Sequence, residues 1–285
     1  MLVIVGYVVV VGSVLGGFLL HGGKMSALFQ PFELMIIGGA AIGAFIVGSS
    51  QKVLKATFQA LPTCLKGSKY TKTRYMELMA LLYDVLTKIR KEGMMSVERD
   101  IEAPHESALF NKFPAISADH HLIEFITDYL RLMVSGNMNP LEIENLMDQE
   151  IETHHQEGHL PADAIQKVAD GLPAFGIVAA VMGVVNVMGS VGEPPAILGA
   201  KIGAALVGTF VGILLAYGFV GPLPGLLGQK LEEGTKELQC IKVTLLACLQ
   251  GYAPQVAVEF GRKILYSTER PTFIELETHV KQKRA

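Results

Sequence analysis

The chain has 285 residues and a formal net charge of -3, with 50% hydrophobic and only 18% charged residues. This composition is too apolar for an ordinary soluble domain, and the balanced charge gives no reason to propose nucleic-acid binding. We therefore expect a membrane protein built from apolar helices of roughly 20 residues, the length that crosses the hydrocarbon layer of a bilayer.

The first predicted domain, residues 1–51, is a hairpin of two membrane spans. Its uncharged blocks cover residues 1–20 and 34–51, and Lys24 lies in the short link between them. The first block lacks the basic start of a cleavable signal peptide and is longer than the apolar part of such a peptide, so we interpret it as a retained span.

Residues 52–170 are predicted to form a helical loop. Apolar residues recur at spacings of three and four between Tyr75 and Ile89, which is typical of an amphipathic helix. A second helix is expected over residues 122–134, and Pro161 is expected to open a later helix that continues into the next span.

A further helix start is predicted between these two. Asn139, Pro140 and Glu142 have the pattern of an N-cap, a proline at the first helical position and a capping-box acid. Apolar residues then follow at helical spacing, so we expect a helix that begins at Pro140.

The second predicted hairpin is residues 171–229, with blocks over residues 171–192 and 202–229. Its link contains Glu193 and Lys201. The last domain, residues 230–285, is expected to be a helical tail that continues the fourth span. We interpret the basic cluster at its end as disordered; its members are Lys281, Lys283 and Arg284.

The predicted fold class is an all-α polytopic membrane protein with four transmembrane helices and a mainly helical cytoplasmic domain. Of the 24 Lys and Arg residues, 13 lie in residues 51–170 and nine after residue 229, which leaves two in the short links. Basic residues near span ends are retained on the cytoplasmic side. We therefore expect a multi-pass protein of the bacterial inner membrane with both termini in the cytoplasm.

Small residues recur four apart in every predicted span, a spacing that lets helix backbones approach closely in lipid. We expect these positions to pack against helices of the same chain or of neighbouring subunits. They are Gly12 and Gly16, Gly39 and Gly43, Ala179 and Gly183, and Ala204, Gly208, Gly212 and Ala216.

No Asp, Glu, Lys, Arg or His lies deep in any predicted span. Because ion relays in membranes generally use an ionisable group, we expect a partner to supply the carboxylate if this chain conducts. Thr209 is the best polar candidate for the ion pathway, although a hydroxyl bonded to its own helix carbonyl explains it as well. Tyr217 is a weaker candidate, since interfacial anchoring also accounts for it.

The sequence resembles the MotA family of flagellar stator subunits, within the larger group of MotA, TolQ and ExbB proton channels. The segments that carry the resemblance cover nearly the whole chain. They are MLVIVGYVVVVGSVLGG, SKYTKTRYMELMALLYDVL, LPAFGIVAAVMGVV, VGTFVGILLAYGF and GYAPQVAVEFGRK.

The resemblance implies a homo-oligomer, a pentamer in lipid around a dimer of a MotB-like partner whose aspartate carries the proton. It implies that Thr209 faces the ion path and that Pro173 and Pro222 serve conformational change. Sodium-driven relatives carry a threonine where this chain has Ala180, which offers no side-chain oxygen to a hard cation. Proton transport is therefore the better expectation.

The family resemblance also implies contacts with the rotor protein FliG. It maps the charged contact residues onto Arg90 and Glu98, with Glu150 a weaker candidate. Complementary charge at such a contact sets orientation and association rate more than affinity. From the residues alone, these charged side chains are interpreted as ordinary solvent-exposed surface residues.

Three other interpretations stay open. An ExbB-like or TolQ-like energiser would drive a periplasmic partner but is expected to have three spans. A non-conducting membrane scaffold would tolerate replacement of Thr209, Pro173 or Pro222. An enzyme is the least favoured, because the sequence offers no nucleophile and base pair, no metal-type Cys spacing and no phosphate loop, and we expect no cofactor or metal.

Overall fold

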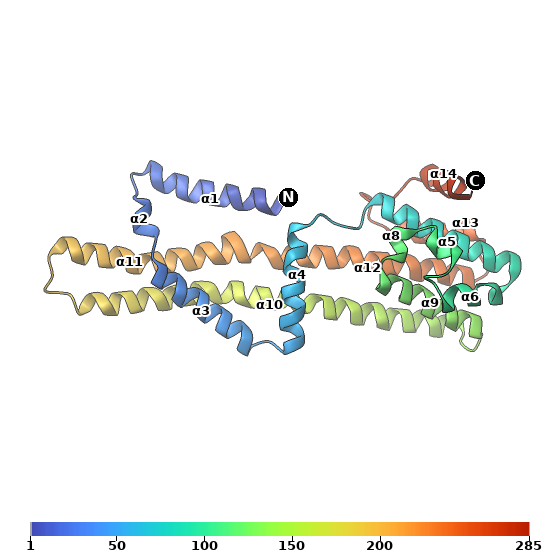
Figure 1. Ribbon diagram of the computed structural model, residues 1–285, viewed down its shortest axis with the longest axis horizontal. Helices are drawn as coiled ribbons and strands as arrows, with labels where there is room; N and C mark the ends of the chain where they lie inside the picture. The colour runs from blue at the N-terminus through green and yellow to red at the C-terminus, as the bar shows by residue number, and fades with distance from the viewer. Residues whose placement is uncertain (1, 285) are drawn as a thin grey trace. The chain divides into compact units, whose positions relative to one another are not determined.

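The computed structural model describes residues 2–284, and every regular element in that range is helical (Figure 1). Four helices are long and apolar enough to cross a membrane. The predicted all-α fold with four spans is therefore confirmed. Met1 and Ala285, the outermost residues of the predicted first and last domains, lie outside the described residues.

The chain divides into two compact units. The membrane unit contains residues 2–67 and Gly158–Gln229, and the polar unit contains Ser68–Glu157 and residues 230–284. Residues 52–67 and 158–170 thus belong to the membrane unit, whereas we assigned them to the helical loop. The physical reason is a shared apolar cluster in which Cys64 packs with Ala162, Ile165 and Leu227.

The membrane unit is built from the apolar helices of both halves of the chain and from shorter segments between them. They are α1 (Leu2–Leu20), α2 (Met25–Leu28), α3 (Pro31–Val47), α4 (Gln51–Leu65), the second part of α10 (Pro140–Met188), α11 (Pro195–Ile213), the π-helical segment η2 (Leu214–Val220) and the first turns of α12 (Pro222–Leu249). Two predicted bounds shift: α3 begins at Pro31 and so includes Glu33, and α11 begins at Pro195 and so includes Lys201.

The α10–α11 pair is held together by glycines. A Cβ atom on Gly212 would lie 2.8 Å from Cα of Gly176, and one on Gly208 would lie 3.1 Å from Cβ of Ala179. A Cβ atom on Gly183 would lie 2.7 Å from Cβ of Ala205. The predicted small-residue contact is therefore confirmed for α10 and α11, since larger side chains would force the helices apart.

The glycines of the first two spans behave differently. A Cβ atom on Gly12, Gly16, Gly39 or Gly43 would meet no atom of the described residues within 4 Å. Among residues 2–284 no other helix packs against the Cβ positions of these four glycines, so packing inside one subunit does not explain them.

The polar unit has its own apolar core, to which all of its longer helices contribute. Its elements are α5 (Lys72–Glu92), η1 (Met94–Val97), α6 (Glu98–Glu102), α7 (Ala108–Asn111), α8 (Pro114–Ser117), α9 (His120–Ser135), the first part of α10, the second part of α12, α13 (Pro254–Ile264) and α14 (Phe273–Arg284). The apolar face predicted between Tyr75 and Ile89 is buried on α5, as expected.

The predicted start of α10 is confirmed, and the predicted helix start at Pro161 is wrong. The backbone N–H of Asn139 donates to Glu142 at 2.8 Å, and the N–H of Glu142 donates to Oδ1 of Asn139 at 3.0 Å, which is a complete capping box. One helix then continues to Met188 with Pro161 inside it. The cost of one missing backbone bond is offset by the packing of the flanking Ala162 and Ile165.

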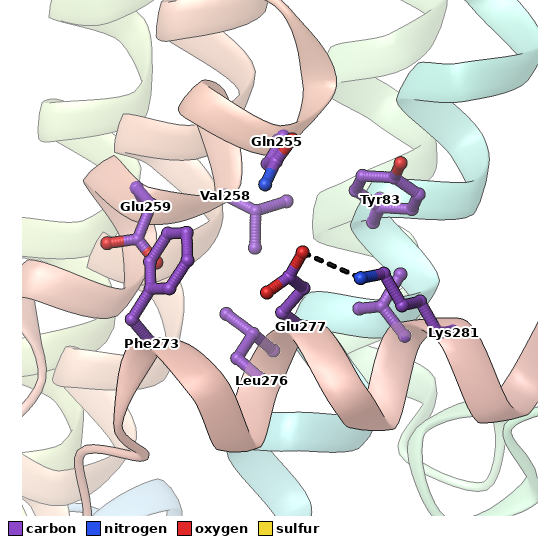
Figure 2. Close-up of a pocket in the computed structure, with 9 residues that line it drawn as sticks. Tyr83, Gln255, Val258, Glu259, Phe273, Leu276, Glu277 and Lys281 are labelled. Carbon is purple, nitrogen blue, oxygen red and sulfur yellow. Dashed lines mark hydrogen bonds and ion pairs between the residues drawn. The ribbon is translucent and has the colours of Figure 1, made fainter.

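The chain end is folded, contrary to the disorder we predicted. Thr272 and Glu275 form a second capping box that starts α14, and Lys72 of α5 holds Glu275 at 2.6 Å. Lys283 pairs with Glu77 at 3.0 Å. Figure 2 shows Leu276 of α14 and Val258 of α13 beside a cavity of about 160 Å³, and on the same face of α14 Lys281 pairs with Glu277 one turn away.

A buried ion cluster ties the helices of the polar unit together. Arg74 of α5 contacts Glu237 of α12 at 2.6 Å and Asp119 at 2.7 Å, and only 3% of the Glu237 side chain is exposed. Burial raises the pKa of Glu237, which Arg74 only partly opposes. Burial acts in the same sense on Asp119, but Lys69 and Arg74 outweigh it and lower the pKa of Asp119.

Candidate functional site

The α10–α11 crossing brings the two main sequence-predicted pathway positions together. A Cβ atom on Gly176 of α10 would lie 3.4 Å from Cα of Thr209. One on Gly208 of α11 would lie 3.2 Å from the backbone N of Ala180. The backbones of Thr209 and Ala180 therefore lie at the crossing of this helix pair, and both residues are half-buried.

Glu33, which we placed just outside the second span, lies within that span in the structure. It occupies the first turn of α3, and its Oε2 atom is buried without a hydrogen-bond partner among the described residues. That oxygen lies 3.1 Å from the position of a Cβ on Gly208, directly before Thr209. Hydropathy gave no signal for Glu33, because the uncharged block of the second span begins at residue 34.

The predicted hinge prolines lie in different settings. Pro173 lies inside α10, where it removes one backbone donor without ending the helix. Pro222 is the first residue of α12 and directly follows the segment η2 and Gly221. Gly221 donates to the carbonyl of Ala216 at 2.7 Å, five residues back, so the fourth span is wound as a π-helix just before this proline.

The π-helical segment was not predicted from sequence. Such segments are rare and occur frequently at functional sites. Tyr217 lies within it and keeps 74% of its surface exposed, so its side chain is not part of the core of this chain. The local signal that could have indicated the segment is the proline two residues after its end, which cannot continue the hydrogen-bond ladder.

The predicted rotor-contact residues lie in the polar unit. Arg90 is exposed in the last turn of α5, and Glu98 is exposed at the first position of α6. Gly93, with φ of 88°, ends α5 between them and turns the chain into η1. A polar hollow of about 430 Å³ adjoins this turn and is lined by Lys88, Ser96 and Asp100, among others.

Glu150 differs from these two residues. It accepts a hydrogen bond of 2.7 Å from the hydroxyl of Tyr129, a largely buried residue of α9. This bond gives Glu150 a structural role in joining α9 to α10. It therefore remains the weakest of the three predicted contact residues.

Family models and individual relatives match this chain over most of its length. Residues 4–93 match the family described as Motility protein A N-terminal, and residues 117–239 match the MotA/TolQ/ExbB proton channel family. Motility protein A of Salmonella typhimurium is 59% identical over all of this chain and 96% of the relative. Chemotaxis protein LafT of Vibrio parahaemolyticus is 40% identical over 95% of each.

Two solved structures are similar in fold. The structure titled as MotAB of C. jejuni superposes with a TM-score of 0.77 at 21% identity, over 93% of this chain and 95% of that one. The flagellar MotAB stator complex from Bacillus subtilis gives a TM-score of 0.76 at 22% identity, over 95% and 98%.

The fold and the sequence matches together define a helical membrane protein of the MotA/TolQ/ExbB proton channel family, which is not a class of enzymes. Within that group, the 59% sequence identity to motility protein A over the full length of the chain shows the narrower family. The chain belongs to the motility protein A family.

Proposed function

We propose that this chain is the stator subunit of a bacterial flagellar motor, which forms a proton channel with a MotB-like partner. The observation that carries the proposal is the 59% identity to motility protein A over the whole chain. The fold supports it, because the similar solved structures carry MotAB in their titles. The four-span layout also disfavours the three-span ExbB-like or TolQ-like energiser.

The proposed assembly is a pentamer of this chain around a dimer of the partner, in the inner membrane with both termini in the cytoplasm. The bias of basic residues toward the polar unit supports the orientation. Gly12, Gly16, Gly39 and Gly43 have open space in front of them in the single chain, which leaves room for close contacts with neighbouring helices.

The proposed ion path follows the face of α11 that carries Thr209. A proton would bind the partner's aspartate near Thr209, and a proton crossing 100 mV makes about 2.3 kcal/mol available. Pro173 and the π-helical segment before Pro222 would let the span bend as the aspartate changes charge. Ala180 supports protons over sodium, since it offers no side-chain oxygen.

The proposed output is force on the rotor protein FliG through Arg90 and Glu98. Both side chains are exposed and lie on either side of the turn at Gly93. This placement supports a contact in which Arg90 and Glu98 pair with residues of opposite charge on FliG. Charge complementarity of this kind orients two proteins as they meet.

The test is complementation in a flagellated bacterium that lacks its own motility protein A. The chain is expressed with its own partner, and swimming speed is measured while proton and sodium gradients are varied separately. We expect motility whose speed follows the proton gradient. Speed that follows sodium would overturn the Ala180 argument, and absent motility with both proteins in the membrane would overturn the stator proposal.

Replacement of the pathway residues distinguishes a proton-conducting stator from a non-conducting scaffold. Thr209→Val and Pro173→Ala are expected to slow swimming without lowering the amount of protein in the membrane. Unchanged swimming with all of the variants at Thr209, Pro173 and Pro222 would favour a non-conducting scaffold.

A further inference from the structure

Glu33 is a half-buried acidic residue of the membrane unit, and it forms no ion pair in the described part of the chain. Its Oε2 atom is buried and lacks a hydrogen-bond partner. An ionised carboxylate in this position would lack the bonds that repay its loss of water, whereas a proton on the oxygen removes most of that cost. The position therefore favours uptake of a proton.

The glycines of α10 and α11 make the space for this carboxyl group. The two carboxylate oxygens lie 3.6 Å and 3.1 Å from the positions of Cβ atoms on Gly183 and Gly208. Ala205 and Ala179 are the other side chains at these contacts. None of these neighbours titrates or carries a charge.

The carboxyl group lies between the α10–α11 turn and the predicted ion path. At about 1.5 Å per residue, Gly183 lies about 8 Å along α10 from the end at Met188, and Gly208 about 20 Å along α11 from Pro195. Thr209 follows Gly208 directly, and Ala180 packs against the same glycine. A proton that enters from the turn side would meet Glu33 at the level of these residues.

We propose that Glu33 is a proton-binding group of the ion pathway, supplied by this chain in addition to the carboxylate of the partner. In the loading step, the carboxylate takes a proton from water at the turn side and becomes a neutral carboxylic acid. In the release step, the acid gives that proton to the partner's carboxylate and is again ionised. The proposal rests on the proposed function, because the second acceptor belongs to the partner.

The first test asks whether Glu33 binds a proton, without requiring motility. Membranes that contain the chain and its partner are treated with N,N′-dicyclohexylcarbodiimide, which adds to protonated carboxyl groups in apolar surroundings, and peptides are analysed by mass spectrometry. We expect an adduct on Glu33 that decreases as pH rises and is absent from Glu33→Gln. Failure of Glu33 to react at any pH, while the partner's aspartate reacts, would overturn the proposal.

The second test measures swimming at matched membrane abundance. Glu33→Gln keeps the shape of the side chain but cannot release a proton, so we expect loss of most of the swimming speed. Glu33→Asp keeps the acid and is expected to retain motility with an altered pH profile. Glu193→Gln is the matched control, because Glu193 lies in the α10–α11 turn and makes an exposed ion pair with Lys201.

The outcomes distinguish the two proposals. If the unchanged chain fails to restore motility, the stator proposal fails, and the carbodiimide result still decides whether Glu33 binds a proton. If the unchanged chain restores motility and Glu33→Gln swims as fast, Glu33 is not part of the pathway. Equal losses in Glu33→Gln and Glu33→Asp would assign Glu33 a packing role and overturn the relay.

Discussion

The hydroxyl of Tyr7 in α1 donates a hydrogen bond of 2.9 Å to the carbonyl oxygen of Phe219 in the π-helical segment. The two rings also lie 5.1 Å apart. The irregular winding before Pro222 alters the backbone bonding of the fourth span, and the first span provides a partner for one of its carbonyls. Residues 212 positions apart thus stabilise the proposed hinge.

Replacing Tyr7 by phenylalanine is expected to weaken this contact while keeping the ring. We expect the free energy of unfolding to fall by about 0.5–1 kcal/mol, the usual net value of one such bond. Equilibrium unfolding of the purified chain in mixed detergent measures the change. Tyr217→Phe is the control, since Tyr217 is 74% exposed, and equal losses in both variants would contradict the prediction.

The close approach of α10 and α11 predicts a steric effect at Gly212. An alanine there would place its Cβ 2.8 Å from both Cα of Gly176 and the carbonyl oxygen of Leu172. We expect Gly212→Ala to lower the free energy of unfolding by about 1–3 kcal/mol, the cost of overpacking. In the same helix, an alanine at Gly199 meets nothing within 4 Å, so Gly199→Ala should not lower stability in the same assay.

The buried ion cluster predicts a large effect at Arg74. Arg74→Met would leave Glu237, whose side chain is only 3% exposed, without its cation. Removing one partner of a buried pair costs about 3–5 kcal/mol, and we expect a loss of that size in chemical unfolding. Arg131→Met removes exposed pairs with Glu102 and Asp128 and one bond to the carbonyl of Ile101, but leaves no buried acid without its cation, so it should cost clearly less than Arg74→Met; similar losses would refute the argument from burial.

His154 predicts a pH dependence of the polar unit. Its Nδ1 atom is buried without a partner, its ring stacks on His121 at 4.9 Å, and burial followed by the charge of His121 lowers the pKa of His154. Because the unfolded chain binds this proton at its ordinary pKa, about 6.5, stability is full above that pH. It falls as pH drops below about 6.5, since the unfolded state gains the proton first.

Hydrogen exchange of α9 and α10 between neutral and mildly acidic pH measures this effect. His154→Phe keeps an aromatic ring but cannot bind a proton, so we expect it to flatten the pH dependence. His105→Phe is the control, because His105 is exposed and contacts the ring of His120 edge to face. An unchanged pH profile in His154→Phe would show that another group is responsible.

The proposed rotor contact predicts an effect of charge without an effect on folding. Arg90→Glu should slow swimming and leave thermal stability unchanged, because Arg90 is exposed at the end of α5. A charge reversal on the rotor protein should restore speed if the contact is electrostatic. Lys91→Glu, at the neighbouring exposed position, is the control, and equal slowing by both would remove the special role of Arg90.

The sequence by itself determined the features that depend on short segments. Hydropathy located four spans, because a bilayer requires continuous apolar helices. The reciprocal bonds of Asn139 and Glu142 were predictable, since capping joins residues three positions apart. Pro161 shows the limit of such rules, because its neighbours pack well enough to keep α10 continuous.

Only the tertiary structure decided which distant residues meet. Glu33 reached the face of Gly208, Tyr7 reached Phe219, and Lys72 held the start of α14 at Glu275. These contacts depend on how helices cross, and helix crossing is set by the shapes of two faces together. Composition and spacing along one chain segment do not contain that information, which is why the sequence showed four apolar spans and gave no sign that an oxygen of Glu33 is buried against two of them.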